Sequence, residues 1–345
     1  MARRLLWASL GLAPLTIVLD SVAHQGKVTL FALAAASLIP LAWLIGESTE
    51  HAGEHTGPRL GGLLNASFGN APEVIIALIA IADSLPNVVR GSLAGSVVSN
   101  ILLVLGAAIL FGEDKPLDRR SLLVQLGLVT LAVAVLLVPS VPGWHGNPER
   151  HSLAVLSIAP AAVLLVLYLV TTTIGLRRGT RPEEAPAGSW SLPAAMAALA
   201  VATAATAVIS EILVHSLEAF AHAAGLPEFF IAIVIVAVVG NAAEHGGAIV
   251  IARRGKMQLA TQIAITSSAQ VGLFVVPLVL LLSFAFAHPL TLAFRPVELG
   301  AMGLAAVLVA FAIRDGRARR WEGALLVAVY AVLCVGFYFA GDRGS

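Results

Sequence analysis

The sequence predicts an all-α polytopic membrane protein with about eleven transmembrane helices. One of them is an extra N-terminal helix, and the other ten form two inverted five-helix repeats with interrupted core helices. Three observations predict this class: the composition, the spacing of long apolar runs, and a polar pentad that occurs once in each half. The 345 residues are 58% hydrophobic and only 12% charged, which leaves little chain for a soluble domain.

Long apolar runs follow one another along the whole chain. A helix needs about 20 mainly apolar residues to cross the hydrocarbon core of a bilayer. Eleven runs of this kind are centred near residues 5–22, 28–46, 59–83, 89–111, 120–138, 152–175, 192–221, 228–252, 258–285, 292–313 and 321–340. We therefore expect an extra N-terminal helix in 1–27, a first repeat in 28–176 and a second repeat in 191–345. The connector 177–190 is rich in proline, glycine and charge, which is typical of a loop, and we expect a cytosolic linker there.

Polar motifs recur in the same order in the two halves. In the first half, Ser-Thr-Glu at 48–50 is followed by Gly-Asn-Ala-Pro-Glu at 69–73 and then by a stretch rich in glycine and serine. In the second half, Ile-Ser-Glu at 209–211 is followed by Gly-Asn-Ala-Ala-Glu at 240–244 and then by a stretch with two serines. A five-span unit repeated in tandem enters the membrane from opposite sides, so the repeats are inverted. Inverted repeats with interrupted helices are typical of secondary transporters.

Glu73 and Glu244 end the two pentads inside long apolar runs. A charged side chain at the bilayer centre costs about 2.5–3.5 kcal/mol even on lenient scales, so a repeated acid at that depth indicates a function. Glycine and proline in these helices free backbone carbonyls, which a bound cation can satisfy. A hard divalent cation such as Ca²⁺ prefers oxygen ligands. The side chains offered for one shared metal site are Glu73, Glu244, Asn70, Asn241, Ser96, Ser99, Asn100, Ser267, Ser268 and Gln270.

The same residues predict competition between the metal and protons. Burial raises the pKa of a carboxyl group and a nearby cation lowers it, so a buried acid that has lost its metal takes up a proton near neutral pH. Exchange follows if the site changes its side of the membrane only while it is occupied. Candidates for the proton or ion pathway are Glu50, expected near the inner surface, Glu211, expected near the outer surface, and His245, directly after Glu244.

The basic residues predict the orientation. With a cytosolic N-terminus, sixteen of the 21 lysines and arginines fall on the inner side; the five outside are Lys27, Arg90, Arg150, Arg295 and Arg343. This asymmetry follows the positive-inside rule, and an odd number of spans leaves the C-terminus outside. Arg90 is expected to snorkel to the outer surface. The net charge of +1 gives no reason to expect a nucleic-acid partner, and a single cysteine allows neither a disulfide nor a thiolate metal site.

Two stretches of the sequence resemble the signatures of a known family. Residues 61–112, which contain Gly-Asn-Ala-Pro-Glu and Gly-Ser-Val-Val-Ser-Asn, and residues 238–277, which contain Gly-Asn-Ala-Ala-Glu-His and Ser-Ser-Ala-Gln-Val-Gly, closely resemble those of the calcium/proton exchangers in the Ca²⁺/cation antiporter superfamily. The resemblance implies eleven spans, a ten-helix core, a midplane site with Glu73 and Glu244, and gating by the second and seventh spans. In two departures, Arg90 stands where the family usually has glutamine and Thr266 where it has glycine.

The expected function is that of a secondary antiporter, not an enzyme, that moves Ca²⁺ out of the cytosol against inward protons. Ca²⁺ and protons are its substrates in a lipid bilayer, and no cofactor is expected. Two carboxylates can exchange one divalent ion for two protons without a change of charge in the site. The alternative among transporters is a sodium/calcium exchanger or another monovalent cation/proton exchanger. We expect a prokaryotic inner membrane, and the oligomeric state is not predicted.

Other interpretations stay open at this level. His51-Ala52-Gly53-Glu54-His55 matches the His-x-x-Glu-His pattern of one type of zinc protease, with the glutamate as general base. The predicted serine, asparagine and glutamine ligands have packing between membrane helices as an alternative role. Glu73 and Glu244 could be structural buried acids, and Glu50 and Glu211 solvated interfacial ones. The short acidic pair in the linker, Glu183 and Glu184, is not assigned a regulatory calcium site.

Overall fold

The protein is described here by a computed structural model, which covers residues 2–22, 26–113, 115–178 and 190–342. Among these residues, eight helices are long and apolar enough to cross a membrane, and a bent pair, Glu228–Gly240 with Ala242–Arg253, raises the number to nine. Two shorter apolar helices, Ala71–Ala82 and Pro296–Ala312, accompany them. The chain is therefore an all-helical membrane protein, as the composition predicts. Residues 179–189 of the predicted linker, with Glu183 and Glu184, lie outside the described residues.

Each predicted apolar run falls on one or more helices, although the third helix continues from one run into the next. The elements are α1 (Ala2–Ser9), α2 (Leu12–Val22), α3 (Lys27–Phe68), α4 (Ala71–Ala82), α5 (Pro86–Val98), η1 (Ser99–Val104), α6 (Leu105–Phe111), α7 (Arg119–Gly143), α8 (His151–Arg178), α9 (Leu192–Ala224), α10 (Glu228–Phe230), η2 (Ile231–Val236), α11 (Ala237–Gly240), α12 (Ala242–Arg253), α13 (Met257–Gln270), η3 (Val271–Val275), α14 (Val276–Ser283), α15 (Pro296–Ala312) and α16 (Arg320–Ala340). The three η elements are π-helical segments, a type of helix that is often found at functional sites.

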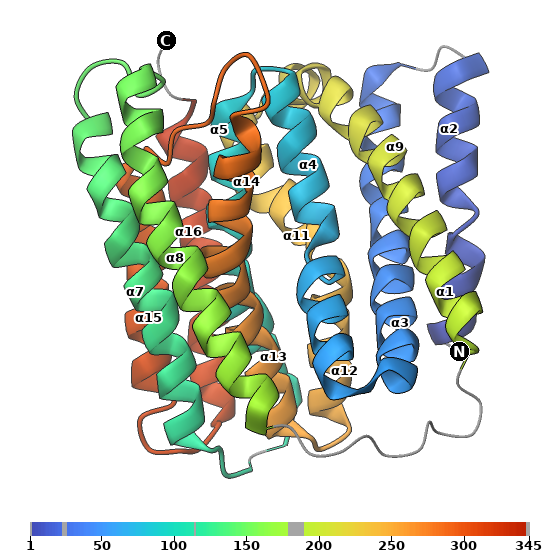
Figure 1. Ribbon diagram of the computed structural model, residues 1–345, viewed down its shortest axis with the longest axis vertical. Coiled ribbons are helices and arrows are strands. Elements are labelled where there is room, and N and C mark those ends of the chain that lie inside the picture. The colour runs from blue at the N-terminus through green and yellow to red at the C-terminus, as the bar shows by residue number, and fades with distance from the viewer. Residues whose placement is uncertain (1, 23–25, 114, 179–189, 343–345) are drawn as a thin grey trace. The chain divides into compact units, whose positions relative to one another are not determined.

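Close contacts divide the chain into two compact units, and each unit takes segments from both halves of the sequence. Unit 1 comprises Met1–Ile79, Tyr168–Gly225 and Val239–Ala243. In it, α3 and α9 pack along each other and α2 packs against both (Figure 1). Leu44, Ile45, Leu199 and Ala202 form a buried cluster between α3 and α9. The hydroxyls of Thr16 on α2 and Ser37 on α3 form a buried hydrogen bond of 3.0 Å, which satisfies two polar groups within an apolar helix pair.

The long helix α3 changes direction at Gly57. This residue has φ 79° and ψ 170°, in a region of backbone space that only glycine enters at low cost. A proline follows at position 58, and the residue before a proline disfavours helical dihedrals. The sequence therefore encodes the bend locally, and the helix beyond it leads directly to the first pentad.

Unit 2 comprises Ala80–Leu167, Leu226–Val238 and Glu244–Ser345. In it, α5 packs against η2, α6 against α16, and α7 against both α13 and α15. Small residues allow the closest approaches: a Cβ on Gly106 of α6 would lie 3.0 Å from the carbonyl oxygen of Gly323 on α16. Close backbone contact through small residues is typical of helices packed in membranes, where lipid offers no hydrophobic driving force between helices.

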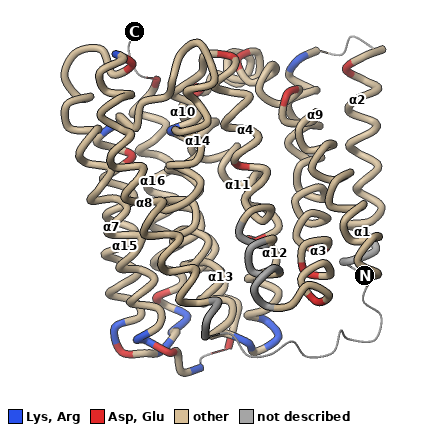
Figure 2. Tube along the Cα trace, viewed as in Figure 1, with Lys and Arg blue, Asp and Glu red and all other residues tan. Residues whose placement is uncertain are grey.

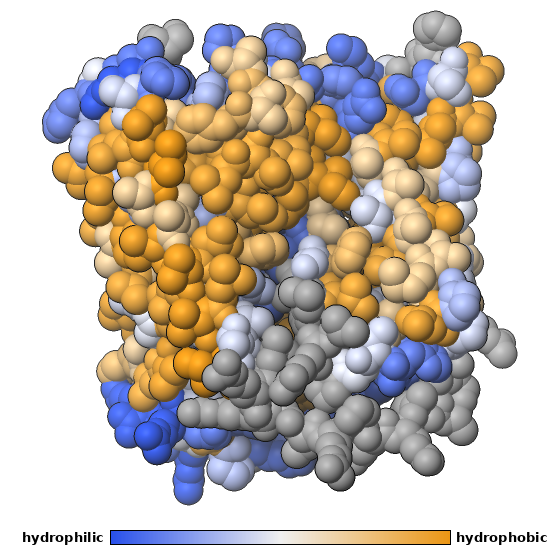
Figure 3. All heavy atoms as spheres, in the orientation of Figure 1, coloured by the Kyte–Doolittle hydropathy of each residue, from blue (hydrophilic) through white to orange (hydrophobic). Residues whose placement is uncertain are grey.

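The surface of unit 2 is apolar along the helices and polar at their ends. On the face that Figure 3 shows, orange apolar side chains cover the middle of the helices and hydrophilic ones lie at the two ends. Val124, Leu131 and Val138 of α7 and Val155 and Val163 of α8 are among the exposed apolar residues. Figure 2 shows lysines and arginines gathered at the end where α7 begins. This pattern fits a bilayer around the middle of these helices.

Candidate functional site

The first pentad interrupts a helix in unit 1. The helix α3 ends at Phe68, and Gly69 and Asn70 form a turn before α4 begins at Ala71. Glu73 therefore lies in the first turn of α4, where free backbone N–H groups and the helix dipole favour negative charge. Glu73 is 7% exposed and Asn70 is 1% exposed. The break thus holds a buried acid and a buried amide close together along the chain, as the sequence predicts.

The second pentad interrupts another helix in the same way. Asn241 separates α11 from α12, and the helices on its two sides are bent by 59°. Glu244 lies in the first turn of α12, at the position that corresponds to Glu73 on α4. Gly240 and Asn241 belong to unit 1, and a Cβ added to Gly240 would lie 3.7 Å from Cγ of Glu73. Within unit 1, the acid of the first pentad therefore lies beside the glycine of the second.

Glu244 belongs to unit 2, where it ends a network of polar side chains. Ser267 of α13 donates a hydrogen bond to Oε2 of Glu244. The Nδ2 of Asn100, in η1, donates to Oγ of Ser267 at 2.9 Å, and Nε2 of His245 lies 2.9 Å from Oδ1 of Asn100. Asn100, Ser267 and His245 are all buried. Of the predicted metal ligands, the structure thus brings Glu244, Asn100 and Ser267 together, and it adds His245 to them.

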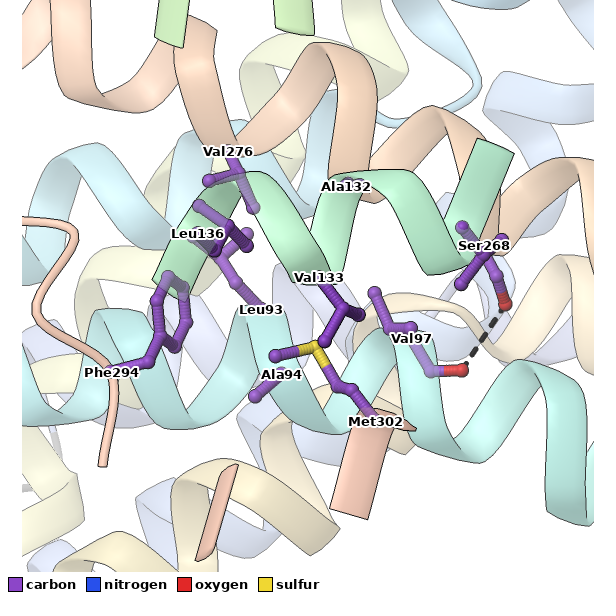
Figure 4. Close-up of a pocket in the computed structure, with 12 residues that line it drawn as sticks. Leu93, Ala94, Val97, Ala132, Val133, Leu136, Ser268, Val276, Phe294 and Met302 are labelled. Atoms are coloured by element: carbon purple, nitrogen blue, oxygen red, sulfur yellow. Dashed lines mark hydrogen bonds between the residues drawn. The ribbon is translucent and has the colours of Figure 1, made fainter. Parts of the chain in front are cut away.

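Two other predicted ligands on these helices, Ser99 and Ser268, contact the backbone. The hydroxyl of Ser99 donates to the carbonyl oxygen of Ser96 at 3.3 Å. The hydroxyl of Ser268 donates to the carbonyl oxygen of Val97 at 3.1 Å, which joins α13 to α5 (Figure 4). A small apolar cavity of about 10 Å³ lies beside this bond. Ser268 thus makes the kind of helix-to-helix bond that was the alternative to a ligand role. Gln270 is the last residue of α13, directly before η3.

Glu50 and Glu211 lie in unit 1 on the paired helices α3 and α9, and both are exposed. Glu211 lines a pocket of about 200 Å³ together with Asp20, Lys27 and His215. Lys27 is the first residue of α3, whereas Glu50 follows 23 positions later, roughly 35 Å further along a helix that rises about 1.5 Å per residue. Glu211 therefore lies beside the start of α3, whereas Glu50 lies seven residues before its bend at Gly57.

Arg90 corrects a prediction. It does not snorkel to a surface, because it is only 1% exposed. Its guanidinium donates to Oε1 of Glu149 at 2.5 Å, to Oδ1 of Asn87 at 2.8 Å and to Oγ1 of Thr291 at 3.1 Å. These partners lie at the start of α5 and in two loops of unit 2. Arg90 was misassigned because its partners are distant in sequence, and a buried arginine needs all of them to offset its desolvation.

Replacing Glu149 is expected to lower the stability of the protein more than replacing Arg90. The carboxylate is 34% exposed and the guanidinium 1%, so Glu149 can return to water whereas Arg90 cannot. We expect Glu149→Leu to cost about 3 kcal/mol of stability and Arg90→Gln about 1 kcal/mol. Thermal unfolding in detergent, with Glu218→Leu at an exposed position as control, measures the order. A larger loss for Arg90→Gln than for Glu149→Leu would contradict this account.

Known proteins resemble this chain over almost its whole length. A family model described as sodium/calcium exchanger protein matches residues 27–176 and 194–339. The Ca²⁺/H⁺ antiporter ChaA of Bacillus subtilis is 37% identical, with 94% of this chain and 96% of that protein covered. A Ca²⁺/H⁺ antiporter of Aphanothece halophytica is 33% identical, with 92% and 91% covered. The chain belongs to the calcium/proton exchanger family. The resemblance predicted from the two signatures is thereby confirmed.

Solved structures agree with this assignment. The structure of native YfkE is 33% identical and superposes with a TM-score of 0.84, covering 97% of this chain and 99% of that one. An H⁺/Ca²⁺ exchanger called CAX shares the fold with a TM-score of 0.75 at 16% identity, covering 98% of this chain and 92% of that one. The proteins of this family are transporters, and the membrane-spanning helices of this chain fit that class.

The protease pattern does not assemble a metal site in the described residues. The Nδ1 of His51 lies 3.0 Å from Oε2 of Glu54, whereas Nε2 of His55 lies 2.6 Å from the carbonyl oxygen of Trp190. The ring of His51 stacks on Trp190 with 4.9 Å between ring centroids. Among the described residues, no group of three or more His, Cys, Asp or Glu side chains is arranged to hold a metal. The two histidines instead contact the first described residue after the linker.

Thr266, the second departure from the family pattern, has a partner on a neighbouring helix. Its hydroxyl donates to Oε1 of Gln125 on α7 at 2.7 Å. Gln125 was not among the predicted site residues, although a lone amide inside an apolar run was a signal for it. Thr266, inside the second signature, and Gln125, outside both signatures, thus join the helix of Ser267 to α7.

Proposed function

We propose that the protein is a secondary antiporter that exchanges cytosolic Ca²⁺ for external protons by alternating access. The observation that carries the proposal is the repeated helix break, which puts an acid in the first turn after each interruption. The names of its relatives describe Ca²⁺/H⁺ antiporters and vacuolar cation/proton exchangers. Membership of the family makes the same chemistry the natural use of these two acids.

The site we propose combines both pentads with the polar residues of α5, η1 and α13. Glu73 and Glu244 supply the charge, and Asn70, Asn241, Ser96, Ser99, Asn100, Ser267, Ser268 and Gln270 are the oxygen donors from which the remaining ligands come. Two carboxylates neutralise one Ca²⁺ and equally accept two protons, so either load leaves the site uncharged. An uncharged site crosses a low-dielectric region at the smallest cost, since an isolated buried charge is heavily penalised.

Access to this site is assigned to Glu50 on α3 and Glu211 on α9. Glu50 and Glu211 would collect ions at opposite membrane surfaces, and the pocket at Glu211 supports a water-filled entrance there. His245, the third residue predicted for the pathway, contacts Asn100 instead of a surface. We assign eleven spans in two inverted repeats, 28–176 and 191–345, after an N-terminal helix in 1–27, because the family model aligns with two separate stretches of similar length.

The orientation follows from the basic residues. The loop regions at 113–120, 253–257 and 314–320 carry most of the lysines and arginines of unit 2, and they are connected: Lys115 donates to the carbonyl oxygen of Gly255 at 3.0 Å, and Leu117 to that of Gly316 at 2.8 Å. By the positive-inside rule this end faces the cytosol. With an odd number of spans and the basic residues Arg3 and Arg4, we propose a cytosolic N-terminus. We propose a prokaryotic inner membrane because Ca²⁺/H⁺ antiporters of bacteria are among the relatives.

Sodium/calcium exchange is the second candidate. The matching family model is described by that name, and a sodium–calcium exchanger, NCX_Mj, shares the fold with a TM-score of 0.56 at 20% identity, covering 90% of this chain and 97% of that one. Against it, α5, η1 and α6 contain no acid, and neither do α13, η3 and α14. The core of the site thus offers two carboxylates, which suit one divalent ion and two protons.

Purified protein in proteoliposomes distinguishes the two functions. We expect Ca²⁺ uptake driven by an imposed pH gradient, with protons moving in the opposite direction and no requirement for sodium. An opposing sodium gradient without a pH gradient is expected to drive at most about a tenth of that flux, a difference of roughly 1.4 kcal/mol in the transition state. Liposomes without protein and a panel of Mn²⁺, Mg²⁺ and Na⁺ are the controls. Uptake that follows the sodium gradient would replace proton coupling by the second candidate.

A further inference from the structure

A chain of hydrogen bonds joins His245 to its own neighbour Glu244 through two other segments of unit 2. It runs from Nε2 of His245 to Oδ1 of Asn100 over 2.9 Å, and from Nδ2 of Asn100 to Oγ of Ser267 over 2.9 Å. From Ser267 the last bond leads to Oε2 of Glu244. Two residues that are adjacent on α12 are thus connected through η1 and α13.

The inventory of donors sets the direction of this chain. Ser267 has a single hydroxyl proton and gives it to Glu244, so it must accept a bond from Asn100. Asn100 then turns its NH₂ group toward Ser267 and its oxygen toward His245. That oxygen can only accept, and the proton between it and the imidazole therefore lies on Nε2. Bonds that point the same way along such a chain strengthen one another, and this chain ends at Oε2 of Glu244.

This direction matters for a cation at Glu244. The end of the Asn100 amide that faces Ser267 is the NH₂ group, which carries hydrogens and does not bind a hard cation, whereas the amide oxygen does. Asn100 can serve as a ligand beside Glu244 only after its amide has turned over. Its NH₂ group would then face His245. Histidine meets both situations without a change of charge, because its neutral ring donates from Nε2 in one tautomer and accepts there in the other.

We propose that His245 is a positioning residue that sets which end of the Asn100 amide faces Glu244. With the site empty of metal it holds the amide oxygen and keeps the NH₂ group toward Ser267; when a divalent cation arrives it accepts the NH₂ group and releases the oxygen to the metal. The inference rests on the proposed metal site at Glu244. It differs from a role in carrying protons, because the imidazole only exchanges one tautomer for the other.

Transport measurements on two variants distinguish a residue that positions Asn100 from one that carries protons or only packs. Glutamine can donate and accept at this position but does not titrate, whereas leucine does neither. We expect His245→Leu to lower kcat/KM for Ca²⁺ about tenfold or more, because leucine removes the hydrogen bond that His245 makes to Oδ1 of the buried Asn100. His245→Gln is expected to recover the wild-type value to within about threefold. Equal loss in both variants would indicate a proton carrier, and leucine matching glutamine would indicate packing alone; either result overturns the proposal.

The tautomer of His245 gives a readout that does not depend on transport. We expect ¹⁵N NMR of histidine-labelled protein in lipid to show His245 protonated on Nε2 without Ca²⁺ and on Nδ1 with saturating Ca²⁺. The spectrum of His245→Gln identifies the signal among the nine histidines. A signal that Ca²⁺ leaves unchanged, in protein that exchanges Ca²⁺ for protons, overturns the inference alone. Protein that neither binds nor carries Ca²⁺ overturns the proposed function as well.

Discussion

Glu73→Gln and Glu244→Gln are each expected to abolish Ca²⁺-driven proton flux while the protein stays folded. Glutamine keeps the shape of the side chain and one oxygen but removes the negative charge. A divalent ion in the site would then be left with a net positive charge in a buried setting, which costs at least about 3 kcal/mol, or a hundredfold in affinity. The proton load fails in the same variants, because an amide does not take up a proton near neutral pH.

The measurement is proton flux in proteoliposomes after Ca²⁺ addition, with folding checked by size-exclusion chromatography and thermal unfolding in detergent. The matched control is Glu113→Gln, because this carboxylate lies in a loop outside the membrane-spanning helices. The ammonium of Lys115, 2.8 Å away, lowers the pKa of Glu113, so the Glu113 carboxylate is charged at neutral pH. The Glu113→Gln variant should keep the wild-type flux. Substantial flux in Glu73→Gln or in Glu244→Gln would show that the site does not need both acids.

Gly95→Ala is expected to disrupt unit 2, although it adds one methyl group. A Cβ on Gly95 would lie 2.0 Å from the carbonyl oxygen of Ile233 and 2.8 Å from Cβ of Ala237. The obstructing oxygen belongs to the backbone of η2, so it cannot move aside as a flexible side chain could. Alanine favours helix over glycine by about 1 kcal/mol. We expect the clash to exceed that gain and to leave a net loss of about 3 kcal/mol or more.

Thermal unfolding of the purified variants in detergent measures this effect. Gly300→Ala on α15 is the control, since an added Cβ there would meet no heavy atom within 4 Å; it should be neutral or slightly stabilising. We also expect Gly95→Ala to lose transport with stability, because α5 leads into η1 and its contact with η2 fixes Asn100 in unit 2. An unfolding temperature equal to that of the wild type would mean that the two helices do not approach so closely.

Local features of the sequence determined much of this protein. The length of the apolar runs gives the class, because the bilayer demands about 20 apolar residues per helix. The glycine and asparagine of each pentad predict the helix breaks, since they free backbone groups at that point. The acids in the following turn then stand out as the costly residues. The bend at Gly57, which the structure shows, also has a local cause, because a glycine before a proline favours a bend. These inferences need only neighbouring residues.

Only the tertiary structure decided how distant residues meet. The sequence predicted a surface arginine at position 90. In the structure, Arg90 is buried and its partners include Glu149 and Thr291, which are 59 and 201 positions away in the chain. His245 and Asn100 are 145 positions apart, and Thr266 and Gln125 are 141 apart. A hydrogen bond depends on the positions of two atoms to within a few tenths of an ångström, and periodicity along one helix carries no such information about another. The sequence thus determines which groups are costly in a membrane, and packing decides which partners make them stable.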